Sequence, residues 1–189
     1  NWKQIDTGGL KVSAIKTDGT LWGWGINGNG QLGLGNTIQY SSPKQVGALT
    51  NWSKGSAGAY HTLAIKTDGT LWMWGRNDDG QLGLGFNEYR TTASLAWTDV
   101  KTVRASCEGW FATVLKNDGT LWFAGYGGNG QFGNGTNDTY STWTQTELSG
   151  DITGSGAITD IAVGENYTAI LMEDGTVWAC GDEFISGNT

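Results

Sequence analysis

The sequence is short of cysteine, proline and histidine. It has one proline, Pro43, and two cysteines, Cys107 and Cys180, in 189 residues. Two thiols do not make a disulfide scaffold, so we expect both cysteines to be small, buried apolar residues. The single histidine, His61, excludes a cluster of histidine metal ligands.

Positive charge is also scarce. Eleven Lys and Arg residues stand against eighteen Asp and Glu residues, which gives a formal net charge of −7. A nucleic-acid binder needs a basic surface to displace counterions from phosphates, so we expect no nucleic-acid partner. No apolar run approaches the roughly 20 residues of a membrane-spanning helix, so we expect no membrane insertion.

Glycine and tryptophan are abundant instead, with 32 and 11 copies. Glycine at this frequency without a triplet period indicates many tight turns rather than collagen. Each tryptophan that is buried removes roughly 150–250 Å² from water. Eleven of them can therefore support a substantial core.

One motif recurs along the chain. Asp-Gly-Thr begins at residues 18, 68, 118 and 174, with spacings of 50, 50 and 56 residues. AIKTDGTLWGWG (14–25) returns as AIKTDGTLWMWG (64–75), VLKNDGTLWFAG (114–125) and ILMEDGTVWACG (170–181). GQLGLG follows at 30–35 and 80–85, and GQFGNG follows at 130–135. We place the repeats at about 1–50, 51–98, 99–155 and 156–189.

Each repeat reads as β-strands. Asp-Gly between apolar runs predicts a two-residue type I′ hairpin, in which the glycine takes a positive φ. These glycines are Gly19, Gly69, Gly119 and Gly175. For the first repeat we predict strands at 3–7, 12–16, 21–25 and 44–49, with a long loop before the last.

The strand after the hairpin is apolar on both sides, as Leu21 alternates with Trp22. A strand that is covered on both faces is typical of stacked blades. We therefore predict an all-β propeller of antiparallel four-stranded blades, with three full repeats and most of a fourth. The tryptophans expected at equivalent buried positions are Trp22, Trp72, Trp122 and Trp178.

Two further segments carry a resemblance to a known family. GAYHT (58–62) and WGRNDDGQLG (74–83) resemble the Gly-x-x-His-Thr and Trp-Gly-x-Asn-x-x-Gly-Gln-Leu-Gly motifs of the regulator of chromosome condensation repeat. The resemblance covers nearly the whole chain and implies a single propeller arc over 1–189, about half of the family's usual seven-bladed ring. We expect the open blade faces to be covered by further blades or by another chain.

The same resemblance bears on activity. Guanine-nucleotide exchange in this family needs specific loops and a basic arm that the sequence does not show, so we do not expect it. The family's ultraviolet-B photoreceptor carries Gly-Trp-Arg-His-Thr motifs, which read Gly-Ala-Tyr-His-Thr at 58–62. We therefore expect the repeated tryptophans to be structural.

No catalytic or metal-binding pattern is present. No serine or cysteine has a general base positioned to activate it as a nucleophile. The segment Asn77-Asp78-Asp79-Gly80 lacks the spaced carboxylates of a calcium-binding loop. The sequence predicts a protein that is not an enzyme and that uses no cofactor and no metal.

Aromatic residues that break the repeat are the candidate binding residues. Tyr60 and Trp110 share one repeat position just before a strand, His61 and Phe111 follow them, and Trp143 stands where the first repeat has proline. Aromatic side chains on loops are enriched at recognition surfaces. The alternative is that they pack against a neighbouring loop.

We predict a non-enzymatic protein-interaction or scaffold module that presents blade loops to a protein partner or neighbouring chain, a second copy that completes the ring included. One alternative is a structural component of an extracellular or virion assembly. Another is a carbohydrate-binding module with Tyr60 and Trp110 as stacking platforms. The acidic, lysine-poor composition favours an extracellular or virion-surface location.

Overall fold

The chain folds into four antiparallel sheets with no helix among the residues described. The computed structural model describes residues 1–146 and 156–182. Three sheets have four strands each, in the orders β1-β2-β3-β4, β5-β6-β7-β8 and β9-β10-β11-β12. The fourth sheet has three, β13-β14-β15. None of these residues forms a helix long and apolar enough to cross a membrane.

The strand bounds follow the repeat. The first blade holds β1 (Trp2–Gly8), β2 (Lys11–Lys16), β3 (Leu21–Gly25) and β4 (Tyr40–Gln45). The second holds β5 (Trp52–Ala57), β6 (His61–Lys66), β7 (Leu71–Gly75) and β8 (Arg90–Trp97). The third holds β9 (Val100–Ala105), β10 (Phe111–Lys116), β11 (Leu121–Gly125) and β12 (Tyr140–Gln145). The fourth holds β13 (Ile158–Val163), β14 (Tyr167–Met172) and β15 (Val177–Gly181).

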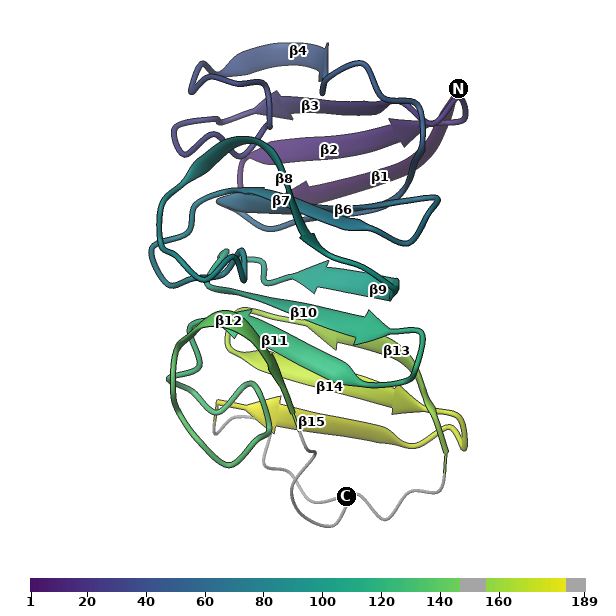
Figure 1. The fold of residues 1–189 in the computed structure, drawn as a ribbon, viewed down its shortest axis with the longest axis vertical. Helices are drawn as coiled ribbons and strands as arrows, with labels where there is room; N and C mark the ends of the chain where they lie inside the picture. Colours follow the sequence, from purple (N-terminus) through teal and green to yellow (C-terminus); the bar gives the residue numbers. More distant parts are fainter. Residues whose placement is uncertain (147–155, 183–189) are drawn as a thin grey trace.

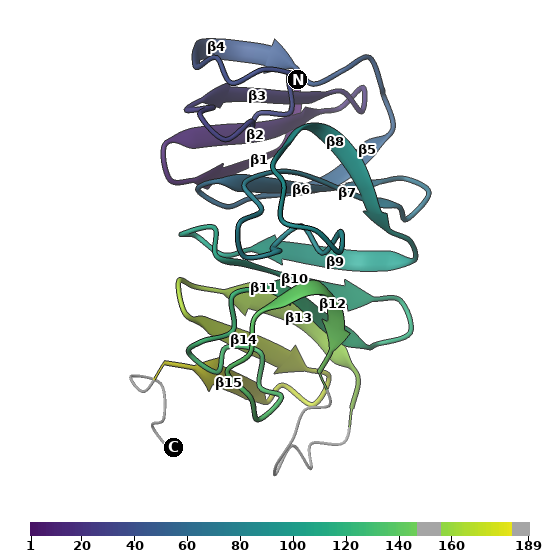
Figure 2. The same ribbon diagram turned by 60° about the vertical axis from the view of Figure 1, so that its left-hand side comes forward.

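The blades stack in chain order, as Figures 1 and 2 show. The first strands of successive blades, β1, β5, β9 and β13, lie beside one another, and β4 and β8 lie at the outer edge. Buried apolar side chains fill the space between blades. The predicted all-β propeller of three full blades and most of a fourth is confirmed. The repeat boundary predicted near residue 155 lies outside the described residues.

The stack has two rims. The turns between the first and second strands and the long loops after the third strands lie on one rim, on the left in Figure 1, which we call the long-loop face. The Asp-Gly-Thr hairpins lie on the other, which we call the hairpin face. The two faces therefore present different parts of each repeat.

The fourth strand of the first blade lies at 40–45 rather than at the predicted 44–49. Tyr40 pairs with Gly25 and Gln45 pairs with Trp22, so Pro43 stands inside the strand. Proline is tolerated there because β4 is an edge strand, whose outward N–H groups have no ladder partner to lose. Reading Pro43 as part of the loop displaced the prediction.

The hairpins differ from the predicted two-residue turn. The four glycines do have positive φ, at 79°, 80°, 85° and 86°. Asp18, however, has no positive φ, and the bonds Gly19 N–H to Lys16 O and Lys16 N–H to Thr20 O enclose three residues. This is a type I turn followed by a left-handed glycine.

Side chains explain this choice of turn. Asp18 Oδ1 accepts hydrogen bonds from the backbone N–H and the hydroxyl of Thr20, at 3.0 and 2.6 Å. These bonds hold the pKa of the Asp18 carboxyl below its usual value. Thr20 Oγ1 in turn accepts the indole N–H of Trp22 at 2.8 Å. The same relay recurs in the second and third blades.

In the first three blades this relay draws the repeated tryptophan toward the hairpin face. Trp22, Trp72, Trp122 and Trp178 are partly buried rather than buried, which corrects the prediction. Lysine covers two of the indoles, with Lys16 Nζ 3.9 Å from the Trp22 ring and Lys66 Nζ 3.7 Å from the Trp72 ring. The repetition of these contacts indicates a structural role.

Replacing Gly69 by valine tests the hairpin. Gly69 has φ +80°, and a Cβ there would meet no atom closer than 3.9 Å, so the expected cost is backbone strain alone. We expect a loss of about 1–2 kcal/mol in the free energy of unfolding, measured by urea denaturation. Gly28→Val is the control, because Gly28 has open space around it and no positive φ. Equal losses in the two variants would contradict the turn assignment.

Candidate functional site

On the long-loop face, backbone hydrogen bonds join connections within each blade and between neighbouring blades. Arg76, the first residue after β7, donates its N–H to Tyr60 O at 2.8 Å, and Tyr126, the first after β11, donates to Trp110 O at 3.0 Å. The turns of the second and third blades are joined by Ala59 N–H to the carbonyl of residue 107, at 3.0 Å. The residues at 60, 76, 110 and 126 are therefore fixed relative to one another.

Their side chains form one cluster across two blades. The Arg76 guanidinium carbon lies 4.5 Å from the centroid of the Trp110 ring and 5.7 Å from that of Tyr60. The rings of Trp110 and Tyr126 lie 6.4 Å apart. Tyr60 and Tyr126 are 37% and 36% exposed. We call Tyr60, Arg76, Trp110 and Tyr126 the aromatic–arginine cluster.

Two carboxylates and a tyrosine hold Arg76 in place. Its Nε lies 3.0 Å from Asp78 Oδ2 and its Nη2 lies 3.5 Å from Asp79 Oδ2. Tyr89 Oη donates a hydrogen bond to Asp78 Oδ2 at 2.7 Å. Burial raises the pKa of Asp79, and the charge of Arg76 opposes that rise. The guanidinium is thus positioned in advance of any partner.

The loop that carries these groups is anchored by a buried amide. Asn77 Oδ1 accepts the N–H of Leu82 at 2.9 Å, and its Nδ2 donates to Glu88 O at 3.2 Å. Asn77 is fully buried. Because one side chain ties both ends of the loop, Arg76 and Tyr89 project from a rigid scaffold.

Of the sequence-predicted binding residues, Tyr60 and Trp110 belong to this cluster, and His61 and Phe111 do not reach the surface. Both of these are fully buried. They begin strands β6 and β10, where side chains alternate between the two faces, so each points into the space between blades. Burial, followed by the charge of Lys11, lowers the pKa of His61 to about 3.

Trp143 lies in a packing position between blades rather than in the cluster. Its ring is partly buried and stacks on Trp97, with centroids 5.5 Å apart. Its indole lies against Gly83 of the preceding blade, as that of Trp74 lies against Gly33. The candidate surface therefore leaves out Trp143.

Sequence reasoning missed Arg76 and Tyr126. Both are the first residue after the third strand of a blade, a position that reads as the start of a long polar loop. Comparing the repeats position by position would have found them, because the first repeat has Ile26 there. What the repeat could not indicate is that this position lies beside Tyr60 and Trp110.

Cys107 also lies on the long-loop face. It is exposed, and Cys180 is partly buried, so the expectation that both are buried is wrong. Cys107 follows β9 in a surface turn. Partial burial raises the pKa of its thiol, and the charges of Glu108 and Glu165 raise it further. Two carboxylates thus stand close to this turn.

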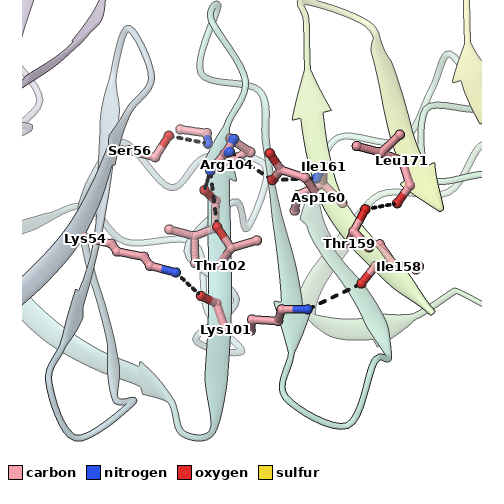
Figure 3. A network of polar contacts seen from close by, with 12 residues as sticks. Lys54, Ser56, Lys101, Thr102, Arg104, Ile158, Thr159, Asp160, Ile161 and Leu171 are labelled. Atoms are coloured by element: carbon pink, nitrogen blue, oxygen red, sulfur yellow. Dashed lines mark hydrogen bonds and ion pairs between the residues drawn. The ribbon is translucent and has the colours of Figure 1, made fainter. Parts of the chain in front are cut away.

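A second polar region lies along the inner strands, as Figure 3 shows. Lys54 Nζ donates to Lys101 O at 2.8 Å, and Lys101 Nζ donates to Ile158 O at 3.4 Å. Arg104 pairs with Asp160 at 3.1 Å. Each contact joins one inner strand to the next, so we assign this network to blade-to-blade cohesion. Within the described ranges no group of three or more His, Cys, Asp or Glu side chains could hold a metal ion.

Comparison with known proteins agrees with this architecture. A family profile described as "Regulator of chromosome condensation (RCC1) repeat" matches residues 18–65 and 68–96. A second profile of the same description matches residues 52–81 and 158–184. Together the two cover more than half of the chain.

Individual proteins match over less of their own length. The ultraviolet-B receptor UVR8 of Arabidopsis thaliana is 46% identical over 43 residues, which are 23% of this chain and 10% of that protein. Human WBSCR16 superimposes with a TM-score of 0.80 and 20% identity, over 96% of this chain and 48% of that chain. Prp20p from Saccharomyces cerevisiae superimposes with a TM-score of 0.75 and 21% identity, over 95% of this chain and 43% of that chain.

At 20–21% identity the structural matches establish the fold alone. The chain spans less than half the length of each of these proteins. The repeat profiles establish more, because they match the repeated motif itself in the first, second and fourth blades. The chain belongs to the family of proteins built from regulator of chromosome condensation (RCC1) repeats.

Proposed function

We propose that this chain is a non-enzymatic protein-interaction module that binds its partner through the aromatic–arginine cluster on the long-loop face. The observation that carries the proposal is the cluster itself. Tyr60, Arg76, Trp110 and Tyr126 come from two adjacent blades and meet at the surface. Tryptophan, tyrosine and arginine are the residues that most often dominate the binding energy of protein interfaces.

Relatives support a protein as the partner. The yeast protein Prp20p was described together with its binding properties to Gsp1p and histones. Yeast RCC1 (Prp20) was also described bound to Kap60. These partners belong to those proteins, and they motivate the class of ligand rather than its identity here.

A carbohydrate ligand is the second candidate, and one contact argues against it. A sugar that stacks on tryptophan needs a free ring face, and Arg76 already lies 4.5 Å over the ring of Trp110. A protein partner needs no such face, because it can pack around an aromatic ring and its arginine together. The geometry therefore favours a protein.

Photo-crosslinking tests which face binds. With a photoreactive amino acid at position 60, we expect a crosslinked protein partner from the native source. The same amino acid at position 67, on the hairpin face, is expected to give none of it. The captured partner is then purified for affinity measurements. A crosslink from both positions in equal yield would contradict a binding site on the long-loop face.

Trp110→Ala and Tyr126→Ala are each expected to weaken binding of that partner at least about fivefold, because truncating an interface anchor costs more than about 1 kcal/mol. Isothermal titration calorimetry measures the affinity, and a thermal melt checks that each variant is folded. Leu49→Ala is the control, since Leu49 is 47% exposed and lies beside the hairpin face. Unchanged affinity in both cluster variants would refute the proposal. Glycan-array binding lost in Trp110→Ala would favour the carbohydrate alternative.

A further inference from the structure

We infer that the partner segment that binds the aromatic–arginine cluster is basic, rich in lysine and arginine. The inference rests on the proposed function and adds the chemistry of the partner. It follows from the distribution of charge around the cluster rather than from the net charge of the chain.

Charge on the long-loop face is predominantly negative. In the described connections on this face Arg76 is the sole basic residue, and it is paired with Asp78 and Asp79. Of the two other arginines, Arg90 begins β8 and lies 4.3 Å over the Phe86 ring, and Arg104, near the end of β9, is paired with Asp160. The acidic residues of the same connections are Asp78, Asp79, Glu88, Glu108, Asp138, Glu165 and Asp182.

Several of these carboxylates surround the cluster. Asp78 contacts Arg76 directly, and Glu108 stands two residues before Trp110. Glu165 lies in the turn between β13 and β14, and β13 packs against β9 and β10, which flank the turn that carries Glu108. Both charges also raise the pKa of the Cys107 thiol in that turn. Among the described residues neither Glu108 nor Glu165 forms an ion pair, and both are exposed. The aromatic centre thus has at its rim two carboxylates, those of Glu108 and Glu165, that no ion pair within the described ranges neutralises.

The hairpin face differs. Each of its first three hairpins carries a lysine two residues before the aspartate, as in Lys16 and Asp18. Lys116 Nζ lies 3.7 Å from Asp118 Oδ2. Both signs of charge therefore alternate there, and the one-sided charge is specific to the face with the cluster.

A basic segment matches both features of this surface. Lysine and arginine stack on exposed aromatic rings, here those of Tyr60 and Tyr126, and the carboxylates at the rim attract them from a distance. Charge complementarity of this kind raises the association rate and excludes acidic partners. An acidic segment would meet Arg76 only where Asp78 and Asp79 already pair with it.

Selection from a random peptide library tests the sign of the charge. Short peptides on phage are selected on the purified chain and counter-selected on the Trp110→Ala variant. We expect the enriched peptides to carry net positive charge. Their affinity is expected to fall steeply as salt rises from about 0.05 to 0.3 M, where the Debye length shortens below about 10 Å.

Matched variants locate the charge. The double variant Glu108→Gln with Glu165→Gln is expected to lower the affinity for the selected peptides about tenfold. It is also expected to flatten the salt dependence of that affinity, because both rim charges are lost. Glu173 is exposed near the hairpin face, so Glu173→Gln is expected to leave the affinity and its salt dependence unchanged. Equal effects of the rim and control variants would overturn the inference.

The outcomes separate the two proposals. Enriched peptides that need Trp110 but are neutral or acidic would overturn the basic partner and leave the proposed binding face intact. If no enriched peptide depends on Trp110, the proposed function falls and the inference falls with it.

Discussion

Lys11→Met is expected to raise the free energy of unfolding by about 2–4 kcal/mol at pH 7, because each unit of pKa depression corresponds to about 1.4 kcal/mol. Lys11 begins β2 and is 2% exposed between the first two blades. Its Nζ donates to Thr62 Oγ1 at 2.6 Å, and that hydroxyl donates to Gln31 O at 2.8 Å. Burial lowers the pKa of the ammonium from 10.5 to about 7, while the charge of Asp6 opposes the change.

The sign of the pH dependence follows from these values. The folded pKa lies below the unfolded one, so the unfolded chain binds the proton more tightly between about pH 7 and 10.5. Stability of the native sequence therefore rises with pH across that window and is lowest below it. Methionine keeps the length of the side chain and has no proton to lose. The free energy of unfolding of the Lys11→Met variant therefore lacks this contribution to the rise with pH.

Urea unfolding at several pH values measures both effects. Lys44→Met serves as the control, because Lys44 is exposed on β4. That variant should keep the slope of the native chain. Suppose that the Lys11→Met variant is less stable at pH 7 and that its free energy of unfolding still rises with pH as in the native chain. This result would show that the lysine is not a strained, buried cation.

Trp74→Ala is expected to lower the free energy of unfolding by about 3–5 kcal/mol, the usual cost of truncating a buried aromatic side chain. Trp74 is 1% exposed. Its indole N–H donates to Gln31 O at 3.0 Å, and a Cβ on Gly33 would lie 2.7 Å from Nε1. The indole thus fills the space between the second blade and the long loop of the first. Leu10→Ala, at a side chain that is 75% exposed, is the control.

The third blade suggests a rescue. There the position of Trp74 is held by Ala124, and Trp143 on the neighbouring strand places its indole against the corresponding glycine, Gly83. The strand registers make Ala93 the second-blade equivalent of Trp143. Adding Ala93→Trp to Trp74→Ala is therefore expected to recover part of the lost stability, measured by the same denaturation. No recovery would show that the two blades fill this space by different means.

Much of the fold could be predicted from the repeat. Local chemistry is sufficient for the Asp-Gly-Thr hairpins, since glycine supplies the positive φ and the aspartate bonds its own turn. The two-sided apolar strand that includes Leu21 indicated stacked blades, because only a covered sheet tolerates apolar residues on both faces. Where the prediction failed, at Pro43, an edge strand tolerated a residue that local rules assign to a loop.

The sequence by itself determined the repeat, the strand order within each blade and two members of the cluster, Tyr60 and Trp110. Only the tertiary structure decided that His61 is buried while Tyr60 beside it is exposed. It alone brought Arg76 onto Trp110, across 34 positions and from a different blade. The physical reason is that a repeat specifies contacts within a blade through turn and strand chemistry. Contacts between blades depend on how far and at what angle one sheet stacks on the next.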